Sequence, residues 1–203
     1  MQPASVLVML ALILSSVASQ AVGRHPRPIP SQPALSGRWL MHETSWGVLS
    51  SISTLQGIEG APFGNPQSVV DGPYHDGLLG DNSTGIPYFF VSEMDVSQVD
   101  ALSNSLVSLT CSEAALANGC TLTDPESPVC IRLTVTGEMV EVVDEEEKAF
   151  AMQALFQRHP KMEGWPTDHD WKVKKIVPRH VFVLDMFGGV KAVSVEEYLS
   201  IEL

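Results

Sequence analysis

The chain has 203 residues, of which 44% are hydrophobic and 18% charged, and its formal net charge is −12. This length suits one well-cored domain, and the composition is typical of a globular protein and not of a disordered one. Because 24 acidic side chains face 12 basic ones, the overall field repels nucleic-acid phosphates and anionic membrane surfaces, so we expect neither as a partner.

Residues 1–21 are predicted to be a secretory signal peptide. An apolar stretch at residues 6–14 is too short to cross a bilayer, for which about 20 residues are needed, and small residues follow it up to Ala21. The segment before this stretch carries no basic side chain, which departs from the usual signal peptide, and an uncleaved anchor is the alternative. No later segment is long and apolar enough to cross a membrane, so we expect a secreted protein without membrane insertion.

Residues 22–38 are predicted to be a flexible, proline-rich linker, because their prolines favour extended conformations. One domain is then expected over residues 39–203. Its elements are expected in this order: a strand at 46–55, a strand at 67–70 ended by a D-G-P turn, a strand at 87–92, a short helix capped by Asp95 or Ser97, a strand at 106–109, two strands within 129–143 bent around Gly137, a helix from Asp144 to Pro160, two strands within 172–187, and a last helix capped by Ser194 and Glu197.

This order gives six or seven strands with a few short helices. The connections are short, and strands do not alternate with helices along the chain. Both features favour antiparallel pairing over a parallel sheet. The expected fold class is therefore α+β, with an antiparallel barrel.

The cysteines and a glycosylation sequon fit an oxidising compartment. Cys120 and Cys130 flank a short loop that contains two prolines, and we expect them to form a disulfide. Cys111 is then left as a buried thiol, although its pairing with either of the other two, or between molecules, stays open. Asn82 begins an N-S-T sequon in a stretch rich in turn residues, so we expect it to carry a glycan; an unused sequon is the alternative.

Catalytic motifs are missing from the sequence. It contains no phosphate-binding loop, dinucleotide fingerprint or serine-nucleophile elbow, so we assign no catalytic residue. A possible metal cluster consists of three histidines and two aspartates: His159, His169 and His180, with Asp168 and Asp170. The spacing of the histidines matches no closed zinc pattern, so we assign no metal ligand. Trp165 and Trp171 suit a stacking platform for a flat ligand, but are more often found sealing the end of a barrel.

An ordered series of motifs resembles the CREG family of secreted glycoproteins. It includes TSWGVLSSISTL, GIPYFFVS, DPESPVCIRL, FQRHPKMEGWPTDHDW and LDMFGGVKAVSVEEY, and covers almost everything from residue 42 to residue 198. The resemblance implies an antiparallel split β-barrel like that of flavin-mononucleotide (FMN) oxidases such as pyridoxamine-phosphate oxidase, and a homodimer whose groove is the flavin site in those enzymes. It also implies a secreted or lysosomal glycoprotein, with a receptor among its partners, that controls growth or differentiation.

The early strands lack the cations that a flavin phosphate needs. In flavin enzymes of this fold, basic side chains on these strands anchor the phosphate, whereas no Lys or Arg occurs here between Trp39 and Ile131. The hydroxyls offered in their place are those of Ser50, Ser51, Ser53, Ser68 and Ser92. Neutral contacts to phosphate are about half as strong as charge-assisted ones, and Arg132, Arg158 and Lys161 are the candidate surrogates.

We therefore expect a protein that is not an enzyme, has lost its cofactor and acts by protein contact. No cofactor-binding residue is assigned. The alternative is an FMN-dependent oxidoreductase of the secretory pathway, which rests on the fold alone.

Overall fold

The computed structural model describes residues 25–74 and 82–203, so the predicted signal peptide lies outside the described residues. Within them, seven strands form one sheet, and every pair of neighbours is antiparallel. The order is β2-β1-β4-β5-β6-β3, with β7 also paired to β6. The strands are β1 (Trp46–Ile52), β2 (Pro62–Ser68), β3 (Tyr88–Val91), β4 (Leu106–Ser112), β5 (Arg132–Glu141), β6 (Lys172–Leu184) and β7 (Lys191–Val193).

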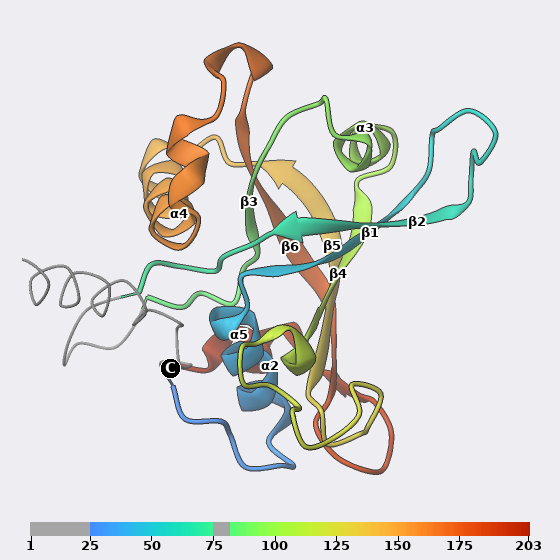
Figure 1. Cartoon of the computed structure of the whole chain (residues 1–203), viewed down its shortest axis with the longest axis vertical. Coiled ribbons are helices and arrows are strands. Elements are labelled where there is room, and N and C mark those ends of the chain that lie inside the picture. Colours follow the sequence, from blue (N-terminus) through green and yellow to red (C-terminus); the bar gives the residue numbers. More distant parts are fainter. Residues whose placement is uncertain (1–24, 75–81) are drawn as a thin grey trace, which may run out of the picture.

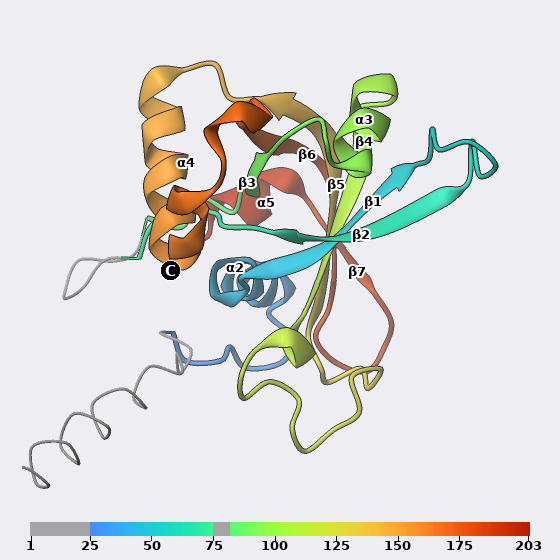
Figure 2. The ribbon, with the colours of Figure 1, turned by 45° about the horizontal axis from the view of Figure 1, so that its top comes forward.

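Three of the α-helices cover one side of the curled sheet. In Figures 1 and 2, α2 (Pro33–Glu43) and α5 (Val195–Ser200) pack together at one end, and α4 (Glu145–Arg158) packs against β3 at the other. The helix α3 (Val96–Ser103) packs on β1. Short 3-10 turns follow β4 and α4: η1 (Glu113–Ala115), η2 (Pro160–Gly164) and η3 (Thr167–His169). No helix of the described residues is long and apolar enough to cross a membrane.

The core lies between the sheet and these helices. Along β5, buried and half-buried residues alternate, so only one face of the sheet is packed. The larger cluster joins side chains of β1, β4, β5 and β6 to the helix α2; among its members are Leu49, Leu109, Leu133, Ile176 and Leu40. A second cluster lies under α4 and includes Tyr88, Val173, Ala154 and Leu155. The expected fold class, an α+β antiparallel split β-barrel, is confirmed.

The predicted helix starts are confirmed by their caps. Asp95, Asp144 and Ser194 each accept a hydrogen bond from a backbone N–H in the first turn of the following helix. These contacts satisfy N–H groups that otherwise have no partner inside the helix.

Two predicted strand pairs are single long strands. Residues 129–143 hold one strand, β5, in which the register shifts between Thr136 and Gly137. A Cβ atom at Gly137 would lie 2.0 Å from the carbonyl oxygen of Val177 on β6, so the irregularity requires glycine. The glycine marks a bulge inside a strand and not a turn between two. Likewise, β6 is a single strand that ends at Leu184.

The predicted linker at residues 22–38 is wrong in its second half. Pro33 is the first residue of α2, a position where its missing N–H costs nothing because the first helical N–H groups have no partner inside the helix. The helix is fixed to the domain because both apolar and polar side chains of it are buried. Examples are Trp39, Leu40 and Arg38. The segment before it is also fixed: the guanidinium of Arg27 donates to Glu113 and to the carbonyl of Val129.

Candidate functional site

The hydroxyls of β1 are already committed to a buried carboxylate. Asp100, on α3, is fully buried. It accepts hydrogen bonds from the Ser51 hydroxyl at 2.7 Å and from the backbone N–H and hydroxyl of Thr54 at 2.7 and 2.8 Å. Burial alone would raise the pKa of Asp100, but these hydrogen bonds lower it below its ordinary value. Asp100 therefore carries a negative charge beside Ser51, one of the hydroxyls offered in place of phosphate-binding cations.

A second carboxylate occupies the N-terminus of α3. Asp95 accepts from the backbone N–H of Ser97 at 2.8 Å, from the amide of Gln67 at 2.7 Å, and from the amide of Asn65 at 3.2 Å. A helix N-terminus with amide donors around it is a natural anion site. Here the anion is a side chain of the protein itself, so this site is filled from within.

The remaining early serines have other neighbours. The Ser53 and Ser92 hydroxyls accept hydrogen bonds from nearby backbone N–H groups. Ser50 lies half-buried on β1, opposite Gly64 and Ser108. Ser68, at the end of β2, lines a pocket described below.

Two of the candidate surrogate cations hold backbone carbonyls together. Arg158, the last residue of α4, donates to the carbonyls of His42 and Thr44 at 2.5 and 2.6 Å, and its guanidinium lies 4.0 Å from the centre of the Tyr74 ring. Arg132 donates to the carbonyl of Glu126 at 2.9 Å. Arg158 thus fastens α4 to the start of β1.

A pocket of about 300 Å³ opens between the end of β2 and the turn after α4. Its lining combines an apolar wall with basic side chains: Ser68, Arg158, His159, Pro160, Lys161, Met162 and Trp165. Lys161 is exposed and has no ion pair among the described residues. His159 is half-buried, and burial lowers its pKa, so the imidazole is neutral at neutral pH. The R-H-P-K-M motif therefore builds a small apolar pocket with a positive rim.

The two tryptophans after this pocket pack on each other, with ring centres 4.6 Å apart. Phe90 of β3 stacks on both of them, at 6.0 and 5.2 Å. Both rings are half-buried over the cluster beneath α4. This arrangement seals one end of the molecule and does not leave an open platform for a flat ligand.

The candidate histidines are not brought together. His169 lies against Trp171 and 3.7 Å from Asp168, and His180 is exposed on β6 next to Phe182. Among the described residues, one set of three metal-ligating side chains lies within mutual reach, and it contains none of these histidines.

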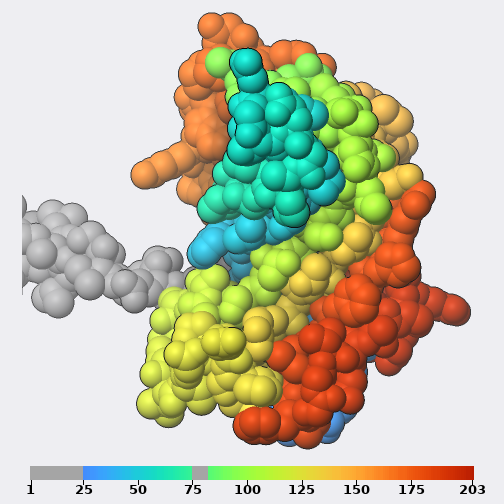
Figure 3. Space-filling model, turned by 90° about the vertical axis from the view of Figure 1, so that its right-hand side faces the viewer, coloured from blue at the N-terminus to red at the C-terminus, as the bar shows by residue number. Residues whose placement is uncertain are grey.

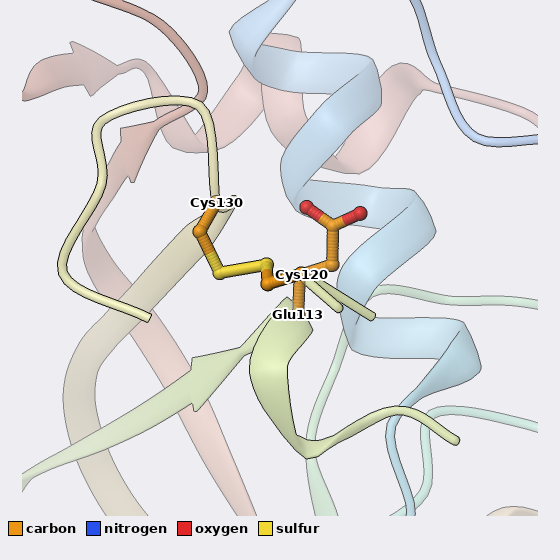
Figure 4. A group of neighbouring side chains, drawn as sticks. All are labelled: Glu113, Cys120 and Cys130. Atoms are coloured by element: carbon orange, nitrogen blue, oxygen red, sulfur yellow. A yellow bond between two sulfur atoms is a disulfide. The ribbon is translucent and has the colours of Figure 1, made fainter. Parts of the chain in front are cut away.

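That set consists of Glu113, Cys120 and Cys130, shown in Figure 4. The two cysteines form a disulfide, which confirms the predicted pair, and Cys111 is a buried free thiol whose pKa burial raises to about 12. Both oxygens of Glu113 accept hydrogen bonds, from Arg27 and from the backbone N–H of Ile131. Because the sulfurs are bonded to each other and the carboxylate is satisfied, the set is a structural clasp and not a metal centre.

Asn82, the predicted glycan site, is exposed. The next two sequon residues hold the chain in place: the Ser83 hydroxyl donates to Asp71 at 2.6 Å and the Thr84 hydroxyl to the Asp71 carbonyl at 2.7 Å. The asparagine therefore lies at the surface of a well-anchored segment.

Comparison with known proteins identifies the family. The family model described as "CREG, beta-barrel" matches residues 28–200. Protein CREG1 of Gallus gallus is 38% identical over 197 residues, which cover 96% of this chain and 100% of that protein. The chain belongs to the CREG family. Protein CREG2 of Homo sapiens is 39% identical over 84% of this chain and 57% of its own length.

Solved structures share the fold of this CREG protein at low sequence identity. A heme binding protein from Mycobacterium smegmatis has a TM-score of 0.64 and 18% identity, over 85% of this chain and 62% of that chain. An Agrobacterium tumefaciens protein of unknown function has a TM-score of 0.59 and 15% identity, over 86% of this chain and 64% of that chain. These similarities concern the fold alone.

Sequence reasoning missed the buried histidine–carboxylate contact beside the sequon. His42 on α2 and Asp71 are both fully buried, and Nδ1 of the imidazole lies 2.6 Å from the carboxylate. Asp71 stands in the D-G-P segment, whose only sequence signal is that of a turn. Asp100 and Glu113 were missed for the same reason: their partners are distant in sequence, and no local pattern marks them.

Proposed function

We propose that this CREG protein is a secreted, homodimeric glycoprotein that binds no flavin, catalyses no reaction and acts by contact with other proteins. The observation that carries the proposal is the pair of carboxylates, Asp95 and Asp100, among the donors of β1, β2 and α3. The growth or differentiation role and a receptor partner come from the family resemblance described above.

The residues present do not fit a flavin phosphate. Phosphate sites use Arg, Lys, or N–H and O–H donors that have no other acceptor. Here the donors of Ser51, Asn65 and Gln67 already point at carboxylates. A phosphate brought to them would meet two negative charges, and like charges at short range are strongly unfavourable where water is excluded.

The fold by itself supports the alternative, an FMN-dependent oxidoreductase. Barrels of one architecture serve many functions, so this support is weak, and nothing in the described geometry adds to it.

The test is a flavin titration of the mature domain purified from a eukaryotic secretion host. We expect the purified protein to be colourless. When the protein is added to a fixed amount of FMN, up to about 100 μM protein, the flavin fluorescence should not be quenched. A yellow protein, or quenching at micromolar protein, would overturn the proposal. In that event, Arg158→Ala and Arg132→Ala would identify the anchor: the one that weakens binding holds the phosphate.

Secretion and glycosylation are tested separately. The exposed position of Asn82 supports a glycan there. We expect the protein in the medium of expressing cells, with the lysosome as the alternative destination, and a mass loss on treatment with peptide-N-glycosidase. The variant Asn82→Gln should lose that mass shift; an unchanged mass in the wild type would contradict the glycan.

The homodimer is supported by the uncovered face of the sheet. On this face, hydroxyl and apolar side chains stand at the centre, and Ser108 and Thr110 of β4 bond to Thr136 and Thr134 of β5. Phe182 of β6 is 40% exposed beside them. In Figure 3, the bands coloured for β2, β1, β4, β5 and β6 cross this surface in the order of the sheet. A face whose centre is uncharged and partly apolar is typical of interfaces between copies.

A further inference from the structure

The disulfide loop presents one apolar side chain completely to solvent. We call residues 113–131 the lobe; they connect β4 to β5 and are closed by the Cys120–Cys130 bond. Leu122 is 98% exposed, more than any other large hydrophobic residue of the described chain. Asp124 and Glu126 follow it, both exposed. The lobe therefore offers a leucine flanked by two carboxylates.

The lobe is held in one shape before it meets a partner. Besides the disulfide, backbone bonds join Thr123 to Cys120 and Ser127 to Asp124, at 3.1 and 2.9 Å. The Arg27 guanidinium donates to Glu113 at its start and to the Val129 carbonyl near its end. A rigid loop loses little conformational entropy on binding, so an apolar side chain at its tip is well suited to be an anchor.

The pocket beside η2 has the complementary chemistry. Its wall of Met162, Trp165 and Pro160 suits an aliphatic side chain, and Lys161 and Arg158 make its rim positive in a protein of net charge −12. Its volume of about 300 Å³ equals that of roughly ten water molecules. This is ample for the four carbons of a leucine side chain.

The lobe and the pocket lie at opposite ends of the molecule. In Figures 1 and 2 the lobe forms the end below α2, whereas α4 and the turn η2 stand at the far end of the sheet. A lobe therefore cannot fill the pocket of its own chain. The uncovered sheet face extends between the two, as Figure 3 shows.

We propose that, in the homodimer, Leu122 of each copy inserts into the pocket of the other, with Glu126 facing Lys161. The inference rests on the proposed homodimer and adds its specific contact. A two-fold axis across the sheet face makes the exchange reciprocal, because each copy then contributes one lobe and one pocket. Carboxylates on the lobe and cations on the rim fix the register of the two copies.

The test compares dimer dissociation constants by sedimentation velocity over a dilution series of the full secreted protein. Leu122→Asp should raise the dissociation constant at least about tenfold, since it would bury a carboxylate against the apolar wall of the pocket. Leu102→Asp is the matched control: Leu102 is 60% exposed on α3, away from both lobe and pocket, and its replacement should change nothing. Equal effects of the two variants would overturn the proposal.

Charge reversal provides a second, independent readout. Lys161→Glu and Glu126→Lys should each weaken the dimer several-fold, and the double variant should recover most of the loss because the pair is restored with opposite signs. If the losses of dimer affinity in the two single variants simply add in the double variant, the Glu126–Lys161 contact is contradicted. A wild-type protein that stays monomeric at every concentration contradicts the homodimer itself, whereas a wild-type dimer indifferent to Leu122→Asp contradicts the lobe contact alone.

Discussion

At the scale of single residues, buried charges that join distant segments are the most informative feature. His42 and Asp71 have no exposed surface, and the carboxylate also accepts from the Ser83 hydroxyl and the Gly85 N–H. Burial alone would raise the pKa of Asp71, but hydrogen bonds from His42 and Ser83 and the positive charge of Arg158 lower it below its ordinary value. The pair therefore ties α2 to the sequon segment only while the carboxylate is ionised.

Replacing this carboxylate is expected to be costly. Asp71→Asn removes one partner of a buried pair, which typically costs about 3–5 kcal/mol. Because the folded pKa of Asp71 is depressed, the stabilisation is complete above the ordinary carboxyl pKa and is lost as pH falls through the folded value. Thermal unfolding at pH 7 should show a melting temperature lower by roughly 6–20 °C, a gap that narrows near pH 3. Asp168→Asn, at an exposed position, should shift it by less than about 2 °C; similar losses for both variants would contradict the prediction.

His159 should make the protein less stable in mild acid. Its pKa is lowered by burial, so as pH falls below about 6.5 the unfolded chain takes up the proton first and the free energy of unfolding decreases. The variant His159→Gln lacks this titration, and its melting temperature should fall less between pH 7.5 and pH 5. His180→Gln, on the exposed part of β6, is the control and should keep the wild-type slope. Identical slopes for all three proteins would refute the assignment.

Local residue signals were predictable from the sequence, and long-range pairs were not. The caps at Asp95, Asp144 and Ser194 follow from a short pattern that depends only on neighbours two or three residues away. The role of Asp95 as the internal anion at α3 needs Asn65 and Gln67 from another strand, and those contacts appear only once the sheet is assembled.

At the scale of elements, the differences between expected and observed structure come from proline and glycine. The strand expected at residues 67–70 is observed as β2, which begins at Pro62 and has Gly64 and Pro66 inside it. This strand is at the edge of the sheet, where a residue without an N–H breaks no hydrogen bond on the open side. Pro33 begins α2 in the same way, because its context is a helix start and not a linker.

The lobe is the element whose stability depends on a covalent bond. The Cys120–Cys130 disulfide spans a separation of 10 residues, and removing it should cost about 2–3 kcal/mol. The double variant Cys120→Ser/Cys130→Ser should therefore melt roughly 4–12 °C lower than the wild type. Cys111→Ala, at a buried free cysteine, is the control that separates loss of a cross-link from loss of a sulfur. A double variant that melts with the wild type would show that hydrogen bonds alone hold the lobe.

At the scale of the whole molecule, charge and burial are distributed unequally over the two faces of the sheet. One face is packed against α2, α4 and α5, and its side chains form both core clusters. The other face carries hydroxyls bonded across β4 and β5, with Phe182 among them and the charged Arg132 and Glu138 farther along β5. An acidic protein repels its own copies at long range, so a dimer requires a surface where like charges do not face each other.

Phe182 is the position where that requirement is most directly tested. Phe182→Glu places a carboxylate opposite Thr134 on the uncovered face, and in an isologous dimer it does so twice, once from each copy. Burial of an unpaired carboxylate is strongly unfavourable, so the dimer dissociation constant should rise at least about a hundredfold in sedimentation velocity. Phe187→Glu is the matched control, since Phe187 is 70% exposed in the loop before β7. A Phe182→Glu protein that dimerises as tightly as its control would move the interface away from this part of the sheet.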